Sequence, residues 1–468
     1  QRDREGQRTP LYRFNDDMVF ADSRLLHAVG WEGEVTDSTY YIDYDSARVY
    51  IGVDPARAQI EITAHDAAIV RTIAPCYGRP PDRRGFMLRG LTFLQYAYRG
   101  LEVEGHDPEG LSPESAHGKD VVGTTLENCT IAYCSRVGAY LRGDRLTVRH
   151  CSVSDTRTEG LYIIGSADVL LEGNVFARNN IENITGYYPA AVKIFNQCYR
   201  ATCSDNLIID QPFSNGVWYD VGNVDGVFVN NRVQGVGSAR GPGSADQLWP
   251  SANGFFFEIS KGAVCAGNVF VDCDHGVMVL NSSDVRVCRN TFVNSVACFG
   301  RNGRVAAGDR FGWHASTGPP LEARNGHVFT DNLLFAGTGY RRPLLFVWQP
   351  PALCAKLSDQ IVAACDGNMF VRERAVAPLA LWSPAPGERC QASLDSLPAM
   401  RRLLPGYALG SRAFDGWDRP LFLNPLLGRY ELLGAFPGAR GGIPLPAGVG
   451  EILGDGGSGV VGADPPVQ

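Results

Sequence analysis

Two acidic side chains in this chain of 468 residues stand at equivalent places in two similar segments. Asp220 ends the segment NGVWYD, and Glu258 ends the segment NGFFFE. Two carboxyl groups about 5 Å apart suit retaining hydrolysis of a glycosidic bond, whereas a separation of about 6.5–9.5 Å suits an inverting reaction. We therefore predict a catalytic pair in which Asp220 is the nucleophile and Glu258 is the acid/base.

The neighbouring positions add a cation and two rings. When the two segments are aligned with the preceding strand, Lys193, Trp218 and Phe256 fall in one column and the two acids fall in the next. Apolar residues alternate with them and are expected to fill the core, so these side chains are predicted to point outward onto one exposed face. A Trp–Phe platform beside two acids is typical of a sugar subsite. Lys193 would hold the nucleophile ionised or bind a substrate hydroxyl or carboxylate.

Three insertions are predicted to leave the fold at the same corner, over residues 179–190, 235–252 and 299–325. Long loops on one corner of a repeat protein usually build its binding site. Neither a metal site nor a cofactor is predicted for a hydrolase, because no Cys/His cluster has ligand spacing. The predicted substrate-binding residues are Trp218, Phe256, Tyr187, Tyr188, Tyr162, Trp249, Trp313 and His314.

A repeat must position these residues. Its motif is a small or polar residue, then Asn or Cys, then a short apolar strand, and uninterrupted copies are 22 or 23 residues apart. Stacked copies would share one core, and stacked Asn side chains can hydrogen-bond to one another in a ladder. The key positions are Cys129, Cys151, Asn174, Asn206, Asn231, Asn268, Asn290, Asn332 and Asn368.

This nine-fold repeat resembles the right-handed parallel β-helix proteins of the pectate-lyase-like superfamily. The resemblance implies an all-β fold, a single-stranded right-handed parallel β-helix, and a secreted or periplasmic enzyme acting on polysaccharides by lyase or hydrolase chemistry. The expected domains are a small N-terminal β-rich domain or cap (1–84), the β-helix (85–375), a closing coil and C-terminal segment (376–438), and a loose Gly/Pro-rich tail (439–468).

These patterns predict a carbohydrate-active enzyme, in the first place a glycoside hydrolase acting on a polysaccharide or oligosaccharide. One alternative is a polysaccharide lyase, in which Lys193 abstracts the C5 proton of a uronic acid while Asp220 and Glu258 hold Ca²⁺. The other is a non-catalytic glycan-binding or surface module, which would keep the rings but would not need aligned acids. A 4,5-unsaturated product and metal dependence distinguish the lyase from the hydrolase.

The composition of the chain limits the kinds of partner that the protein can be expected to bind. A net charge of −7 argues against nucleic acid, which needs a basic face, and no apolar run is long enough for a membrane span. Thirteen cysteines follow the repeat and are predicted to be mostly free, buried thiols. We expect a secreted or periplasmic protein, with a signal peptide either removed before this numbering begins or never present, and many free thiols also fit the cytoplasm. The patterns leave the oligomeric state open.

Overall fold

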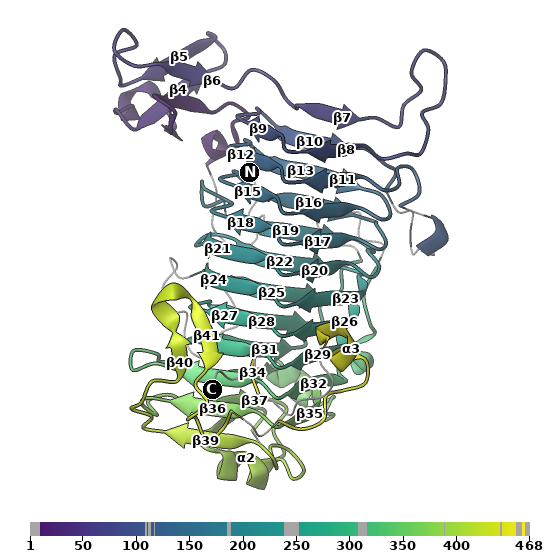
Figure 1. The fold of residues 1–468 in the computed structure, drawn as a ribbon, viewed down its shortest axis with the longest axis vertical. Coiled ribbons are helices and arrows are strands. Elements are labelled where there is room, and N and C mark those ends of the chain that lie inside the picture. Colours follow the sequence, from purple (N-terminus) through teal and green to yellow (C-terminus); the bar gives the residue numbers. More distant parts are fainter. Residues whose placement is uncertain are drawn as a thin grey trace.

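The computed structural model describes residues 10–107, 110, 114–116, 118–184, 189–237, 252–307, 316–387, 389–439, 442–454 and 461–463. The chain winds into a long solenoid whose strands stack in three sheets of 12, 10 and 11 strands, here called sheets I, II and III (Figure 1). In the main body of each sheet, neighbouring strands are parallel and three apart in chain order, so each coil gives one strand to each sheet. This is the predicted parallel β-helix.

Sheet I carries the predicted site. It consists of β7 (Ile69–Arg71), β10 (Arg99–Val103), β13 (Val137–Arg142), β16 (Leu161–Ile164), β19 (Ala190–Phe195), β22 (Asn215–Asp220), β25 (Asn253–Glu258), β28 (His275–Leu280), β31 (Val296–Gly300), β34 (Leu345–Trp348), β37 (Ala380–Trp382) and the antiparallel β38 (Ala392–Leu394).

The other two sheets complete each coil. Sheet II consists of β8 (Met87–Arg89), β11 (Thr125–Glu127), β14 (Thr147–Arg149), β17 (Leu170–Glu172), β20 (Thr202–Ser204), β23 (Val224–Val229), β26 (Lys261–Ala266), β29 (Ser283–Cys288), β32 (His327–Thr330) and β35 (Val362–Asp366). Sheet III consists of β9 (Thr92–Leu94), β12 (Thr130–Ala132), β15 (Ser152–Ser154), β18 (Val175–Ala177), β21 (Leu207–Gln211), β24 (Arg232–Val236), β27 (Val269–Val271), β30 (Thr291–Val293), β33 (Leu333–Ala336), β36 (Met369–Arg372) and β39 (Arg412–Asp415).

The turn between sheets II and III contains the Asn ladder, and the prediction of one Asn column is confirmed. Each ladder side chain accepts the backbone N–H of the previous rung; for example, Asn268 Oδ1 accepts from Asn231 N at 2.8 Å, and Asn290 Oδ1 accepts from Asn268 N at 3.0 Å. The residue before each ladder position has a positive φ, such as 55° at Asn230 and 67° at Gly267. This explains the Gly, Asn and Asp residues found there. The ladder runs through Asn174, Asn206, Asn231, Asn268, Asn290, Asn332 and Asn368, all at most 2% exposed.

The cysteines lie as predicted. Cys129 and Cys151 are buried in adjacent coils at the start of the ladder, where Cys151 N donates to Asn174 Oδ1 at 2.9 Å. Eleven cysteines are free thiols and ten of these are buried, while Cys354 and Cys390 form a disulfide. Buried thiols between aliphatic neighbours act here as small core residues.

The N-terminal region forms two small sheets beside the first coils (Figure 1). The parallel stacking begins at β7, before the predicted start at residue 85, and ends at β39, beyond residue 375. The structure therefore extends the predicted solenoid by one strand at the N-terminal end and past its predicted C-terminal boundary. The strands of the small sheets are β1 (Val19–Ala21), β2 (Arg24–Leu25), β6 (Ile60–Ile62), β3 (His27–Ala28), β4 (Thr39–Asp43) and β5 (Arg48–Ile51).

The C-terminal segment lies along the solenoid. The hairpin β40 (Phe422–Asn424) and β41 (Arg429–Leu432) packs apolar side chains on the outer face of sheet III. The prediction of a loose tail over 439–468 is wrong for residues 442–454. There, α3 (Val449–Leu453) buries Val449 against the outer face of sheet II, which supplies the apolar contacts that the tail's own composition lacks. The other α-helices are α1 (Pro351–Cys354) and α2 (Leu397–Leu403).

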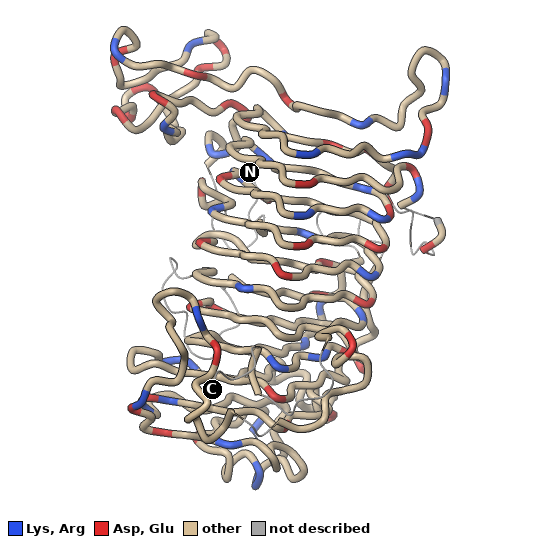
Figure 2. The backbone as a smooth tube through the Cα atoms, in the orientation of Figure 1, with Lys and Arg blue, Asp and Glu red and all other residues tan. Residues whose placement is uncertain are grey.

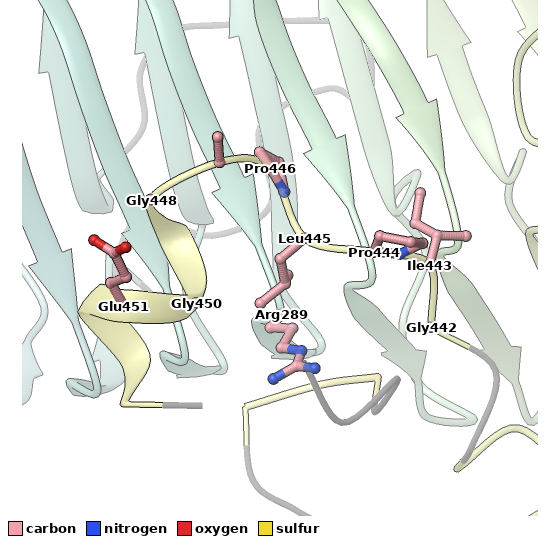
Figure 3. A pocket seen from close by; sticks show the side chains of 10 residues that line it. Arg289, Gly442, Ile443, Pro444, Leu445, Pro446, Gly448, Gly450 and Glu451 are labelled. Atoms are coloured by element: carbon pink, nitrogen blue, oxygen red, sulfur yellow. The ribbon is translucent and has the colours of Figure 1, made fainter. Parts of the chain in front are cut away.

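A pocket of about 560 Å³ lies between this C-terminal segment and Arg289, which precedes the ladder residue Asn290 (Figure 3). Its lining is mostly Gly, Pro and aliphatic residues, with Glu451 as the second charged group. The pocket is thus remote in sequence and in sheet from the predicted acids of sheet I. Among the described residues, no helix is long and apolar enough to cross a membrane.

Candidate active site

The strand register brings the predicted residues together. Lys193 pairs with Trp218 and Trp218 with Phe256, across β19, β22 and β25. In the next column along the strands, Asp220 pairs directly with Glu258. We call these the ring column and the acid column. The ring column comprises Glu102, Tyr140, Tyr162, Lys193, Trp218, Phe256, Met278, Cys298 and Phe346, and the acid column comprises Arg142, Ile164, Phe195, Asp220, Glu258, Leu280, Gly300 and Trp348.

The predicted exposure of this face is wrong. Five predicted side chains point away from the solenoid core, yet none is more than 8% exposed, and Glu258 is only 1% exposed. They are Lys193, Trp218, Asp220, Phe256 and Glu258. The physical reason is that segments following β31 and β33 fold back over the face. Ala306 belongs to the same buried cluster as Phe195 of the acid column, and Tyr340 packs against the cluster that contains Trp218. A substrate could reach the acids only if such covering segments move.

Each acid is paired with a cation. Lys193 Nζ lies 3.1 Å from Asp220 Oδ2, and Arg304 Nη1 donates to Glu258 Oε1 at 2.6 Å. Two like charges on adjacent strands repel, and the two cations offset that repulsion. Sequence reasoning missed Arg304; its only signal was a place within the insertion 299–325. The Lys193 side chain is 10% exposed, whereas that of Arg304 is 39% exposed.

The rings do not form an open platform. The Trp218 and Phe256 rings are stacked, with centroids 4.9 Å apart and planes at 15°, and Lys193 Nζ lies 4.1 Å from the Trp218 ring centroid. Trp218 is thus covered by a ring on one face and by a cation on the other. Rungs about 4.8 Å apart place side chains of one column face to face, so their edges point outward. The predicted stacking of a sugar on Trp218 is therefore wrong for this arrangement.

Tyr162 extends the ring column towards the N-terminus. It is 8% exposed and stacks on Tyr140, with centroids 5.2 Å apart and planes at 5°. The other predicted substrate-binding residues lie outside the described residues and stay predictions. They are Tyr187, Tyr188, Trp249, Trp313 and His314.

A file of buried polar groups beside the ring column was not predicted. Asn253 Nδ2 donates to Asn215 Oδ1 at 2.8 Å, and His275 Nδ1 lies 2.9 Å from Asn253 Oδ1. Arg342 Nη2 lies 3.3 Å from His275 Nε2. Burial, and secondarily the charge of Arg342, holds the pKa of His275 well below its ordinary value, so the ring is neutral and carries its proton on Nδ1. The signal in the sequence was the polar residue before Gly in NGVWYD, NGFFFE and HGVMVL.

This file fixes the starts of three strands rather than reaching the acids. Asn215 Nδ2 also donates to Pro189 O at 3.2 Å, which ties the file to the residue just before β19. The described residues contain no group of three or more His, Cys, Asp or Glu side chains placed to hold a metal ion. The described side chains on this face bring together two carboxyl groups and two cations.

Comparison with known proteins agrees with the fold. Residues 115–297 match a family model described as right handed beta helix region. Together with the strand order, the match confirms the predicted fold class and the predicted resemblance: the chain is a right-handed parallel β-helix protein. A comparison with curated protein sequences gave no match.

Several solved structures are similar at low identity. A complex of XylC with xylose is 10% identical, with a TM-score of 0.47, over 76% of this chain and 64% of that chain. Pectate lyase Pel9A is 13% identical, with a TM-score of 0.34, over 83% and 85%. A point mutant of DFA-IIIase from Arthrobacter chlorophenolicus A6, in complex with DFA-III, is 13% identical, with a TM-score of 0.29, over 68% and 66%. This chain thus spans less than two thirds of the XylC chain, and at such identities the function has to be argued from the side chains.

Proposed function

We propose that this chain is a carbohydrate-active enzyme, and specifically a glycoside hydrolase that uses Asp220 and Glu258. The observation that carries the proposal is the direct pairing of these two carboxylates on neighbouring strands. Adjacent rungs lie about 4.8 Å apart, close to the separation of about 5–5.5 Å between the carboxyl groups of retaining enzymes. The proposal therefore includes a covalent glycosyl intermediate.

The two acids differ in their surroundings, and this difference supports their roles. The cation beside Asp220 is Lys193, which is as buried as its partner and fixes the Asp220 side chain in position as the nucleophile. The cation beside Glu258 is Arg304, which comes from a loop and is partly exposed. Glu258 is therefore proposed as the acid/base that donates a proton to the leaving oxygen.

The lyase alternative fits the contacts less well. A lyase base must be free to take a proton, but Lys193 is bound to Asp220 and lies against the Trp218 ring. The carboxylates that would hold Ca²⁺ are each engaged by a cation. These contacts favour the hydrolase, and the experiment below distinguishes the two reactions.

The test uses a panel of polysaccharides with two readouts, reducing ends and absorbance at 235 nm, with and without a chelator. We expect reducing ends without absorbance at 235 nm, and no effect of the chelator. Asp220→Asn and Glu258→Gln should each lower turnover at least 10³-fold, whereas Glu172→Gln on sheet II should not change it. Absorbance at 235 nm that depends on Lys193 would replace the hydrolase by a lyase. Near-normal turnover of both carboxylate variants would refute the site.

A further inference from the structure

The ring column continues well beyond the predicted site towards the N-terminal coils. Lys193 Nζ lies 5.9 Å from the Tyr162 ring, Tyr162 stacks on Tyr140, and Arg99 lies 4.1 Å from the Tyr140 ring. Arg99 also lies 4.6 Å from the ring of Tyr98, which is 38% exposed. From Phe256 to Tyr140 the column covers four rung steps, or about 19 Å.

In the opposite direction the ring column is closed. The next ring-column residues are Met278, Cys298 and Phe346, which are at most 1% exposed and belong to one apolar cluster. Towards the N-terminus, by contrast, the Glu102 side chain is 22% exposed and Tyr140 is half-buried. Among the described residues of the ring column, exposure therefore increases towards the N-terminal coils.

The charges along this track cancel in pairs. Four cations on or beside the two columns each contact a carboxylate, and Figure 2 shows acidic and basic residues interspersed along the coils. Arg142 lies 2.6 Å from Asp107 and also donates to the Tyr140 hydroxyl at 3.0 Å. The pairs are Arg99–Glu102, Arg142–Asp107, Lys193–Asp220 and Arg304–Glu258.

We propose that the substrate of this face is an uncharged glycan that runs from the acids towards the N-terminal coils, over Tyr140 and Tyr98. This inference rests on the proposed function of Asp220 and Glu258. Sugar hydroxyls can donate to carboxylates and exchange hydrogen bonds with Tyr hydroxyls, while apolar sugar faces pack on ring edges and on the exposed ring of Tyr98. A polyuronate would bring negative charge to cations that are already paired, and would face their carboxylates.

Affinity electrophoresis in native gels tests the proposal, with Glu258→Gln as the parent so that turnover does not consume the polymer. The neutral gels contain xylan, mixed-linkage β-glucan, galactomannan or inulin, and the acidic gels contain polygalacturonate or alginate. We expect retardation by at least one neutral polymer and by neither acidic one. Tyr140→Phe should weaken that binding about five-fold, the loss of one hydrogen bond. Tyr77→Ala, at a fully exposed ring outside the columns, is the control and should leave it unchanged.

A charge variant sharpens the test of substrate class. Asp107 is 59% exposed, so Asp107→Asn should fold normally, and it removes the partner of Arg142. We expect this variant to gain retardation by polygalacturonate. Retardation of the parent by a polyuronate would overturn the inference. Failure of every neutral polymer to retard the parent, or binding of a neutral polymer that Tyr140→Phe leaves unchanged, would also overturn it. Neutral binding through Tyr140 without any hydrolysis would instead refute the proposed function and leave the track standing.

Discussion

The burial of the ion pair between Lys193 and Asp220 can be tested by measuring how each residue contributes to the free energy of unfolding. The Nζ–Oδ2 distance is 3.1 Å, and the side chains are 10% and 8% exposed. Removing one partner of a buried pair leaves an uncompensated charge and costs about 3–5 kcal/mol, whereas replacing both is often nearly neutral. Lys193→Met and Asp220→Asn should therefore each lower the free energy of unfolding by about 3–5 kcal/mol. The double variant should lie closer to the parent than either single variant.

Urea denaturation followed by tryptophan fluorescence measures all four corners of this cycle. The matched control is the exposed pair Arg429–Glu431, whose side chains are 55% and 20% exposed. Arg429→Met and Glu431→Gln should change stability by no more than about 1 kcal/mol. Additive losses for Lys193 and Asp220 would show that the two groups do not interact. Losses as small as those of the control would show that solvent reaches the pair, and the closed face described above would then be wrong.

Three further outcomes follow from buried groups. Asn268→Ala should lower the free energy of unfolding, measured by urea denaturation, by about 2–4 kcal/mol, because it leaves ladder donors without acceptors. The control Asn325→Ala, at a half-buried position outside the ladder, should lower it by under about 0.5 kcal/mol. Equal losses in the two variants would contradict the ladder. Ellman titration should find one fast thiol, Cys76, in the native protein and eleven after denaturation without reductant; several fast native thiols would contradict the buried column. Burial raises the pKa of Asp331 from 3.8 to about 7, so its ionisation opposes folding and stability is lost as pH rises from about 4 to about 7. Asp331→Asn should raise the melting temperature at pH 8.5 but hardly at pH 4, and an equal change at both values would refute this.

The sequence predicted those features that depend on the period of the coil. The Asn ladder and the Gly-led strands recur at the same place in each coil, so aligning them also aligns Asp220 with Glu258 and Trp218 with Phe256. A register error of one residue would have moved every side chain to the other face. The apolar residues at 217, 219, 255 and 257 prevented such an error, because the core accepts only one parity.

Burial of the site could not be predicted in the same way. It depends on residues such as Arg304, Ala306 and Tyr340, which belong to the loops after β31 and β33 rather than to the repeated strands. Periodicity says which way a strand residue points, but it contains no information on the path of a loop. The pairing of Glu258 with Arg304 depends on that path alone. Hence the pairing of the two acids on neighbouring strands was predicted correctly. Their burial and the contact of Glu258 with Arg304 were not predicted.

The alternation of inward and outward residues also does not show whether the faces of an outward ring are accessible. This holds for parallel solenoids in general. An outward ring inside a column has neighbours about 4.8 Å above and below it, and these neighbours cover both of its faces. Trp218, between Lys193 and Phe256, is such a case. A ring face is available to a ligand only where a column ends or a rung lacks a partner. Beside the N-terminal end of the ring column stands Tyr98, the most exposed ring of the track. The position of a ring within its column therefore decides what it can bind, and an outward aromatic in mid-column offers a ligand its edge or hydroxyl rather than its face.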